Sequence, residues 1–251
     1  MAVRGNTFGA TITVISTNDS YHTYRDWGLI VSDGDPVGDP EQETNYITVR
    51  GRPGLLDCSE SLTGEPVFKG RRITFDMVMQ TPQDQWSMTV SKIRNSIDGR
   101  RVKVFLDDDP SHYWLGRISV KNTSRVMRCG RFTLEVYADA YKYEKASSQE
   151  KLRWDDMNFL TDCLRYIGTI TVSGQYTLVI PKGEHAVVPT IKVTNITSQT
   201  FSMSVVGTGK SYALVAGTNR FPDLKVCGAE DVTLSFGGSA KVTLTYRGES
   251  L

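Results

Sequence analysis

The chain has 251 residues, which is enough for two domains of about 100–150 residues or for one large β domain. Its 29 Lys and Arg residues balance 28 Asp and Glu residues, whereas dedicated binders of nucleic acid or of anionic membranes usually carry a basic excess or a basic block. The first residues lack the apolar core of a signal peptide and no apolar run is long enough to cross a bilayer, so we expect a soluble chain, made in the cytoplasm, with no membrane partner and no sequence-specific nucleic-acid partner.

The first part of the chain predicts short strands separated by turns. Residues 11–15 and 27–31 are expected as strands, and residues 33–40 are dense in Gly, Pro and Asp, which favour turns. A further strand is expected at 46–49, and it leads into a Gly-Arg-Pro-Gly loop at 51–54. The connection is long, and long connections are usually either functional or flexible.

Residues 71–79 predict a strand with one buried face. The apolar side chains recur at every second position, which is the period of an extended chain: Ile73, Phe75, Met77 and Met79. Pro82 interrupts this pattern, because proline cannot donate a hydrogen bond to a neighbouring strand.

A helix is predicted after this turn, because the apolar period changes to the helical one at Trp86, Val90, Ile93 and Ile97. Gly99 is expected to end the helix, since glycine adopts the left-handed cap conformation without strain. Residues 101–106 return to strand alternation, 107–111 form a turn, and 113–118 begin another strand. Strand, helix, strand, turn and strand make a scaffold with no evident reactive centre.

The second half of the chain predicts a β-sandwich or jelly roll. Before it, further strands of the first part are expected at 117–120 and 131–137, and residues 145–151, which are small and polar, are expected as a linker. Residues 156–166 have the apolar spacing of one or two helical turns. Many short strands with glycine-marked turns then follow, at 169–172, 176–180, 190–194, 201–206, 212–215, 232–236 and 241–246.

Several motifs, taken in their order and spacing, resemble the distal tail proteins of bacteriophages with long non-contractile tails. The stronger matches lie at residues 51–57, 72–75, 93–99, 109–117 and 141–142, and fainter ones lie at 188–191, 221–224 and 246–248. Ala140 departs from the pattern, which has proline at this place.

The resemblance implies a mainly β fold in two parts. Residues 1–144 would form a ring-building, β-sandwich-like domain with one α-helix, 145–166 a linker, and 167–251 a galectin-like or jelly-roll β-sandwich. It implies a structural role at the phage tail tip: six copies form a ring that joins the tail tube protein to a tail-associated lysin or fibre protein. Receptor-binding proteins are further implied partners, and DNA passes through the ring. The long segment that includes 33–54 is then a candidate inter-subunit arm, while an exposed flexible loop is the alternative.

No motif predicts an enzyme, a cofactor or a metal centre. Gly207-Thr208-Gly209-Lys210-Ser211 imitates the end of a phosphate-binding loop, but Ser204 stands where the motif needs glycine and no helix pattern follows, so a hairpin turn is predicted. The nucleophile elbow Gly-x-Ser-x-Gly is absent, and the three histidines and four cysteines are scattered. We therefore expect no catalytic, cofactor-binding or metal-binding residues.

Two clusters have competing interpretations. Asp107, Asp108 and Asp109 with His112 have the residue types of a cation site, but neighbouring turn residues point in different directions, and the three aspartates are instead candidates for the lining of a channel through which DNA passes without sticking. Aromatic residues in the second half would suit either a sugar-binding platform or a core: Tyr176, Phe201, Tyr212, Phe221 and Phe236. The platform interpretation makes a carbohydrate-binding adhesin the alternative function.

Overall fold

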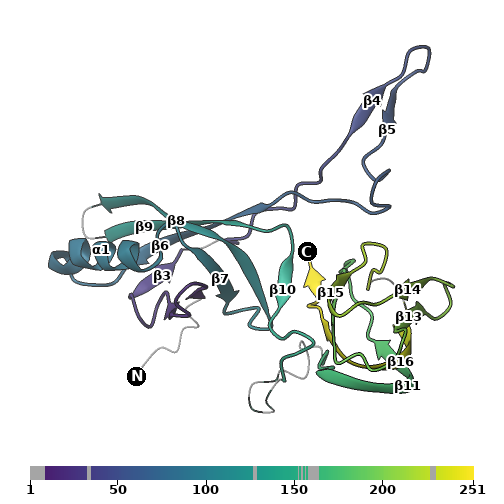
Figure 1. Ribbon diagram of the computed structural model, residues 1–251. Helices are drawn as coiled ribbons and strands as arrows, with labels where there is room; N and C mark the ends of the chain where they lie inside the picture. Colours follow the sequence, from purple (N-terminus) through teal and green to yellow (C-terminus); the bar gives the residue numbers. More distant parts are fainter. Residues whose placement is uncertain are drawn as a thin grey trace. The chain divides into compact units, whose positions relative to one another are not determined.

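The structure is a computed structural model and describes residues 9–32, 35–126, 129–151, 153, 155, 157, 164–226 and 230–251 (Figure 1). The predicted fold class is confirmed: the chain is mainly β, with its one described α-helix in the first half. The chain divides into two compact units, Met1–Lys142 with Leu251, and Tyr143–Ser250. The bounds 1–144, 145–166 and 167–251 stay predictions, and the helical turns expected at 156–166 fall largely outside the described residues.

The first unit is built on a sheet in which seven strands follow the order β2-β1-β7-β8-β9-β6-β3, with antiparallel neighbours. The strands are β1 (Ala10–Val14), β2 (Ser20–His22), β3 (Leu29–Val31), β6 (Arg71–Met79), β7 (Arg101–Leu106), β8 (His112–Val126) and β9 (Cys129–Ala138). Along β6, the predicted alternation is confirmed, since Ile73, Phe75, Met77 and Met79 are all buried.

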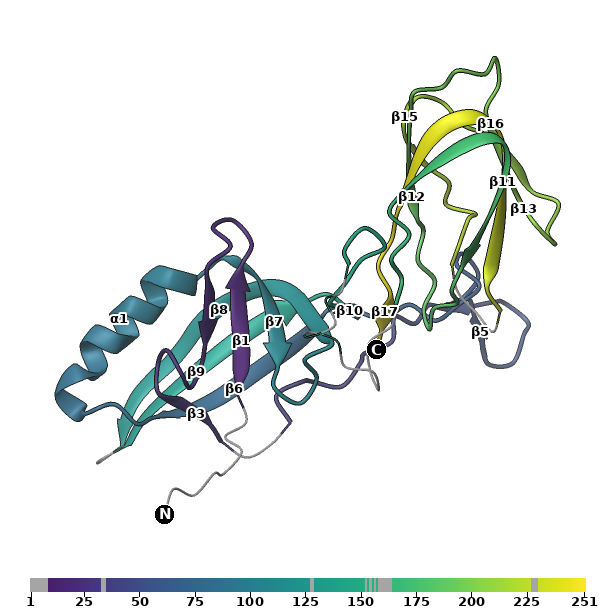
Figure 2. The same cartoon turned by 90° about the horizontal axis from the view of Figure 1, so that it is seen from below.

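The helix α1 (Trp86–Ile97) packs against this sheet, after a short 3-10 turn at Gln83–Gln85 (Figure 2). Trp86, Ile93 and Ile97 are buried in the same core cluster as the strands. Gly99 has a φ of 70°, so the expected glycine at the end of the helix adopts the left-handed conformation. The scaffold predicted from residues 71–118 is therefore confirmed.

The second unit has its own core and a six-stranded sheet in the order β14-β13-β16-β12-β15, with β11 on the other edge of β16. The strands are β11 (Thr169–Ile180), β12 (Thr190–Thr194), β13 (Ser202–Val205), β14 (Ser211–Ala213), β15 (Gly217–Arg220) and β16 (Val232–Thr245). The short strands β10 (Lys142–Glu144) and β17 (Glu249–Ser250) pair with each other.

Two predicted turns are wrong, because β11 and β16 each run unbroken through their glycines. Gly174 lies opposite Gly238, at φ values of 85° and 115°, and Gln175 lies opposite Gly237. Three of these four residues are glycines, so the paired strands bend here instead of ending. Before the bend β16 pairs with β13, and after it β16 pairs with β12. One strand thus serves two parts of a curled sheet.

Gly238→Ala is expected to destabilise the second unit by about 2 to 4 kcal/mol, because the side chain adds both backbone strain and overlap. A Cβ at position 238 would lie 2.7 Å from the Thr200 carbonyl oxygen and 2.8 Å from Ser198 Oγ. Gly174→Ala is the matched control, since it also has a positive φ but meets no heavy atom within 4 Å. Denaturant unfolding measures both variants. Equal losses would show that the close packing around Gly238 is unimportant.

Candidate interaction surface: an exposed hairpin arm

Residues 39–70, which we call the arm, form a hairpin that leads into β6 (Figure 1). At its base, the Glu43 amide donates to the Val67 carbonyl at 2.8 Å and the Lys69 amide to the Glu41 carbonyl at 2.9 Å. Lys69 Nζ also lies 2.7 Å from Glu41 Oε1, which raises the pKa of Lys69 through this hydrogen bond. The two halves of the arm are therefore joined before they reach its outer part.

The outer part of the arm contains the paired strands β4 (Tyr46–Thr48) and β5 (Leu55–Asp57). The Gly-Arg-Pro-Gly loop connects them, with Gly51 and Gly54 at φ values of 82° and 81°, which glycine tolerates and other residues rarely adopt. After β5, Asp57 accepts hydrogen bonds from the Ser59 side chain and backbone, which lower the pKa of that carboxyl. The strand predicted at 46–49 is present at 46–48, and its partner at 55–57 is not predicted from the sequence.

No residue of β4 or β5 is buried, although several are large and apolar. The exposed fractions are 54% for Tyr46, 46% for Ile47, 60% for Leu55 and 99% for Leu62. Ile47 lies opposite Leu56 while Thr48 lies opposite Leu55, so both faces of the hairpin present apolar side chains. A two-stranded hairpin is at best marginally stable alone in water. The arm therefore has the composition of a surface that a partner covers.

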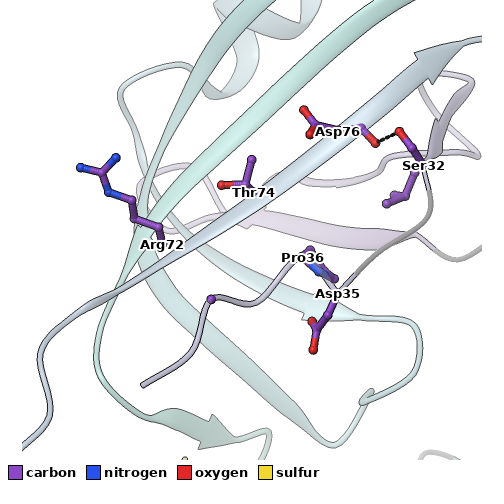
Figure 3. Close-up of a pocket in the computed structure, with 8 residues that line it drawn as sticks. Ser32, Asp35, Pro36, Arg72, Thr74 and Asp76 are labelled. Atoms are coloured by element: carbon purple, nitrogen blue, oxygen red, sulfur yellow. Dashed lines mark hydrogen bonds between the residues drawn. The ribbon is translucent and has the colours of Figure 1, made fainter. Parts of the chain in front are cut away.

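An open groove of about 380 Å³ lies beside the outer edge of β6 (Figure 3). Backbone hydrogen bonds attach the segment 35–38 to the strand: the Thr74 amide donates to the Pro36 carbonyl at 2.8 Å, and the Gly38 amide to the Arg72 carbonyl at 3.0 Å. The groove is lined by Val31, Ser32, Asp35, Pro36, Gly38, Arg72, Thr74 and Asp76.

Several polar groups of this groove hold local structure. Figure 3 shows Ser32, whose hydroxyl donates to the Asp76 carbonyl oxygen at 2.6 Å. The Asp76 carboxylate accepts from Thr133 at 2.7 Å, and the Asp35 carboxylate accepts from the Val37 amide at 2.9 Å. The Ser32 hydroxyl thus donates to a backbone carbonyl oxygen and not to a basic side chain, and both carboxylates accept hydrogen bonds from other groups.

The three candidate aspartates do not converge on one point. Asp107 pairs with His22 at 3.2 Å, and Asp109 pairs with His112 and with Lys142, each at 2.8 Å. Burial raises the pKa of Asp109, but the hydrogen bonds from Lys142 and His112 outweigh it and leave that pKa lowered. Asp108 is exposed. Within the described ranges, no group of three or more His, Cys, Asp or Glu residues is arranged to hold a metal ion.

The other sequence candidates lie in structural positions. Residues 207–210 lie in the turn between β13 and β14, and Ser211 begins β14, so the predicted hairpin turn is present. The Val205 amide donates to the Lys210 carbonyl at 2.9 Å. Phe201 and Phe236 are buried, and Tyr212 and Phe221 pack on the same core with their rings 4.4 Å apart. Of the five aromatic residues only Tyr176 is exposed, so they do not form a sugar-binding platform.

Sequence reasoning did not single out Leu55 and Leu62, which are exposed apolar residues of the arm. A pair of leucines directly after a glycine-rich turn, opposite an expected strand, was the available signal for β5. Leu62 lies in an irregular segment, where no periodicity marks it. Among the described residues, no helix has the length and apolar character that crossing a membrane requires.

Comparison with solved structures shows a match along nearly the whole chain. The fold is similar to that of SPP1 Dit (gp 19.1), described as a paradigm of the hub adsorption apparatus in phages that infect Gram-positive bacteria. The match has a TM-score of 0.58, covers 96% of this chain and 99% of that chain, and has 12% sequence identity. No protein-family profile and no curated protein matches the sequence. The predicted resemblance to distal tail proteins is thus confirmed at the level of the fold.

Proposed function

We propose that this chain is a structural hub protein of a phage tail tip, whose copies assemble into a ring through the first unit. The observation that carries the proposal is the fold shared with SPP1 Dit, combined with an arm that exposes apolar side chains on both faces. The mechanism is self-association and docking, in which no bond is made or broken.

In this proposal, the arm of one copy lies against a neighbouring copy and buries its apolar residues there. The hairpin also has unpaired outer edges, and an edge strand of a neighbour can add to such an edge through backbone hydrogen bonds. Repetition of one such contact around an axis closes a ring when the rotation between neighbours is a full turn divided by a whole number and there is no shift along the axis.

The finer features of the proposal come from the family resemblance. They are a ring of six copies, located in the virion after synthesis in the bacterial cytoplasm. The partners are the tail tube protein on one side, the tail-associated lysin or fibre protein on the other, and receptor-binding proteins. DNA passes through the ring, so we propose a neutral or acidic channel wall with Asp107, Asp108 and Asp109 as candidate lining. A channel lined with Lys and Arg would contradict this part.

The test of assembly is native mass spectrometry of the full chain at roughly 1 to 100 µM, which covers weak to moderate affinities. The expected species is a closed oligomer, with six copies as the predicted number. A photoreactive amino acid at Leu62 should also cross-link one copy to another, whereas the same group at the exposed Val215 of the second unit should not. A monomer at every concentration, with no cross-link from position 62, would overturn the proposal.

A further inference from the structure

In the second unit, the part of the sheet in which β16 pairs with β12 has an outer face of hydroxyl and cationic side chains. We call it the threonine–lysine face, and it lies on four adjacent strands, β11, β16, β12 and β15 (Figure 2). Its residues are Thr169, Thr171, Thr190, Lys192, Thr194, Thr218, Arg220, Lys241, Thr243 and Thr245. All ten are exposed or partly exposed.

The strand register places these residues in rows across the sheet. Directly paired residues of antiparallel strands point to the same side. The central row runs from Thr169 through Thr243 and Lys192 to Thr218. A second row runs from Thr171 through Lys241 to Thr194, and a third runs from Thr245 through Thr190 to Arg220.

The opposite side of the same strands forms the core of the second unit. Ile170, Val172, Ile191, Val193, Val242 and Leu244 alternate with the face residues and are all buried. The direction of the face residues is therefore fixed by the packing of the core, because a shift by one residue would exchange the two sides.

The charge on this face has one sign. Lys192, Lys241 and Arg220 have no ion pair among the described residues, and the face contains no carboxylate. Arg247 continues the same alternation just beyond the end of β16. Its Nη2 lies 3.0 Å from Glu150 Oε2, so we do not count Arg247 in the face. Three cations are thus surrounded by hydroxyl groups, without acids among the ten residues.

The Lys, Arg and Thr side chains of this face are hydrogen-bond donors that suit phosphate oxygens, which are acceptors. Lys and Arg side chains and Thr hydroxyls all contact backbone phosphates where proteins bind phosphodiester chains. Side chains on one face repeat about every 6.6 to 6.8 Å along a strand and about every 4.8 Å across strands, so a linear chain can meet several donors in succession. The ten residues include no aromatic ring, which the stacking of nucleic-acid bases or sugar rings would use.

We propose that the threonine–lysine face binds a linear phosphodiester polymer of a simple polyol, recognised through its phosphates. The unpaired cations supply the attraction, and the threonine hydroxyls supply hydrogen bonds along the chain. This inference concerns the second unit and holds independently of ring formation by the first.

The test measures binding of the full chain to a synthetic oligo(glycerol phosphate) by calorimetry at several salt concentrations. Lys192→Gln with Lys241→Gln should weaken binding about tenfold and lower the slope of log affinity against log salt by about 1.4, at about 0.7 for each lost phosphate contact. The matched control is Lys182→Gln with Lys210→Gln, which removes the same charge from exposed lysines elsewhere on the unit and should change affinity less than twofold. Thr243→Val keeps the shape and charge of the face and should weaken binding about threefold.

Three outcomes would overturn the proposal. The first is an absence of binding by the unmodified chain at millimolar ligand. The second is an equal loss from the two double variants, which would reveal a general charge effect. The third is equal or tighter binding of oligo(dT), which would show that the polymer is a nucleic acid. Hydrogen exchange in β12 and β16 confirms that the variants remain folded.

Discussion

Arg165→Met is expected to lower the free energy of unfolding of the second unit by about 3 to 5 kcal/mol, because it removes one partner of a buried ion pair. The Arg165 side chain is 6% exposed, and its Nε and Nη2 donate to the two carboxylate oxygens of Glu144 at 2.6 and 2.8 Å. Its Nη1 donates to the carbonyl oxygens of Pro181 and Lys182 at 3.2 and 3.0 Å. Without the guanidinium, Glu144 keeps a poorly hydrated charge.

Hydrogen exchange followed by mass spectrometry, read on peptides from β11, β12 and β16, would measure this loss in the unit concerned. Lys210→Met is the matched control at an exposed position, and it should stay within about 0.5 kcal/mol of the unmodified chain. The double variant Glu144→Gln with Arg165→Met should recover part of the loss, since it leaves no buried charge unpaired. Equal effects of the Arg165 and Lys210 variants would refute the structural role of the ion pair.

Changing both Ile47 and Leu55 to Asp is expected to weaken self-assembly by two to three orders of magnitude. Each side chain is about half exposed or more in the single chain, so its burial against another copy would contribute up to about 1.5 to 3 kcal/mol, and a buried carboxylate would add a desolvation cost. Sedimentation velocity over a range of concentrations would give the affinities.

Two controls separate assembly from folding. Val206→Asp with Val215→Asp places the same charges at exposed valines of the second unit and should leave assembly unchanged. Circular dichroism of the arm variant should match that of the unmodified chain, because neither substituted side chain belongs to a core cluster. An arm variant that assembles with unmodified affinity would exclude the arm as the main contact between copies.

Local patterns predicted the elements in which periodicity and core packing agree. The strand at 71–79, the helix at 86–97 and its end near Gly99 all follow from the spacing of apolar residues. β15 was missed because Gly217-Thr218-Asn219-Arg220 has no apolar alternation. Its inward residue is Asn219, which forms two hydrogen bonds with the backbone of Val215. The Asn219 Nδ2 donates to the Val215 carbonyl at 2.8 Å, and the Val215 amide donates to Asn219 Oδ1 at 3.1 Å.

The candidate surfaces depend on features that no local pattern contains. The arm was located by its unusual length, but its exposed apolar faces become evident only when the pairing of β4 with β5 is known. The threonine–lysine face joins residues from four strands, such as Thr171, Thr194 and Lys241, and only the register brings them into one row. Without the register, the many threonines in these segments would indicate only that the segments favour strands.

The long pairing of β11 with β16 has a mechanical consequence. The pairing begins with Thr169 opposite Thr243, so the chain enters and leaves the ladder at the same end. Tension between these two points would unzip the ladder rung by rung instead of shearing all its rungs together. We therefore expect the unit to open under load from the end at which Thr169 lies opposite Thr243, at a lower force than shearing of the whole ladder would need.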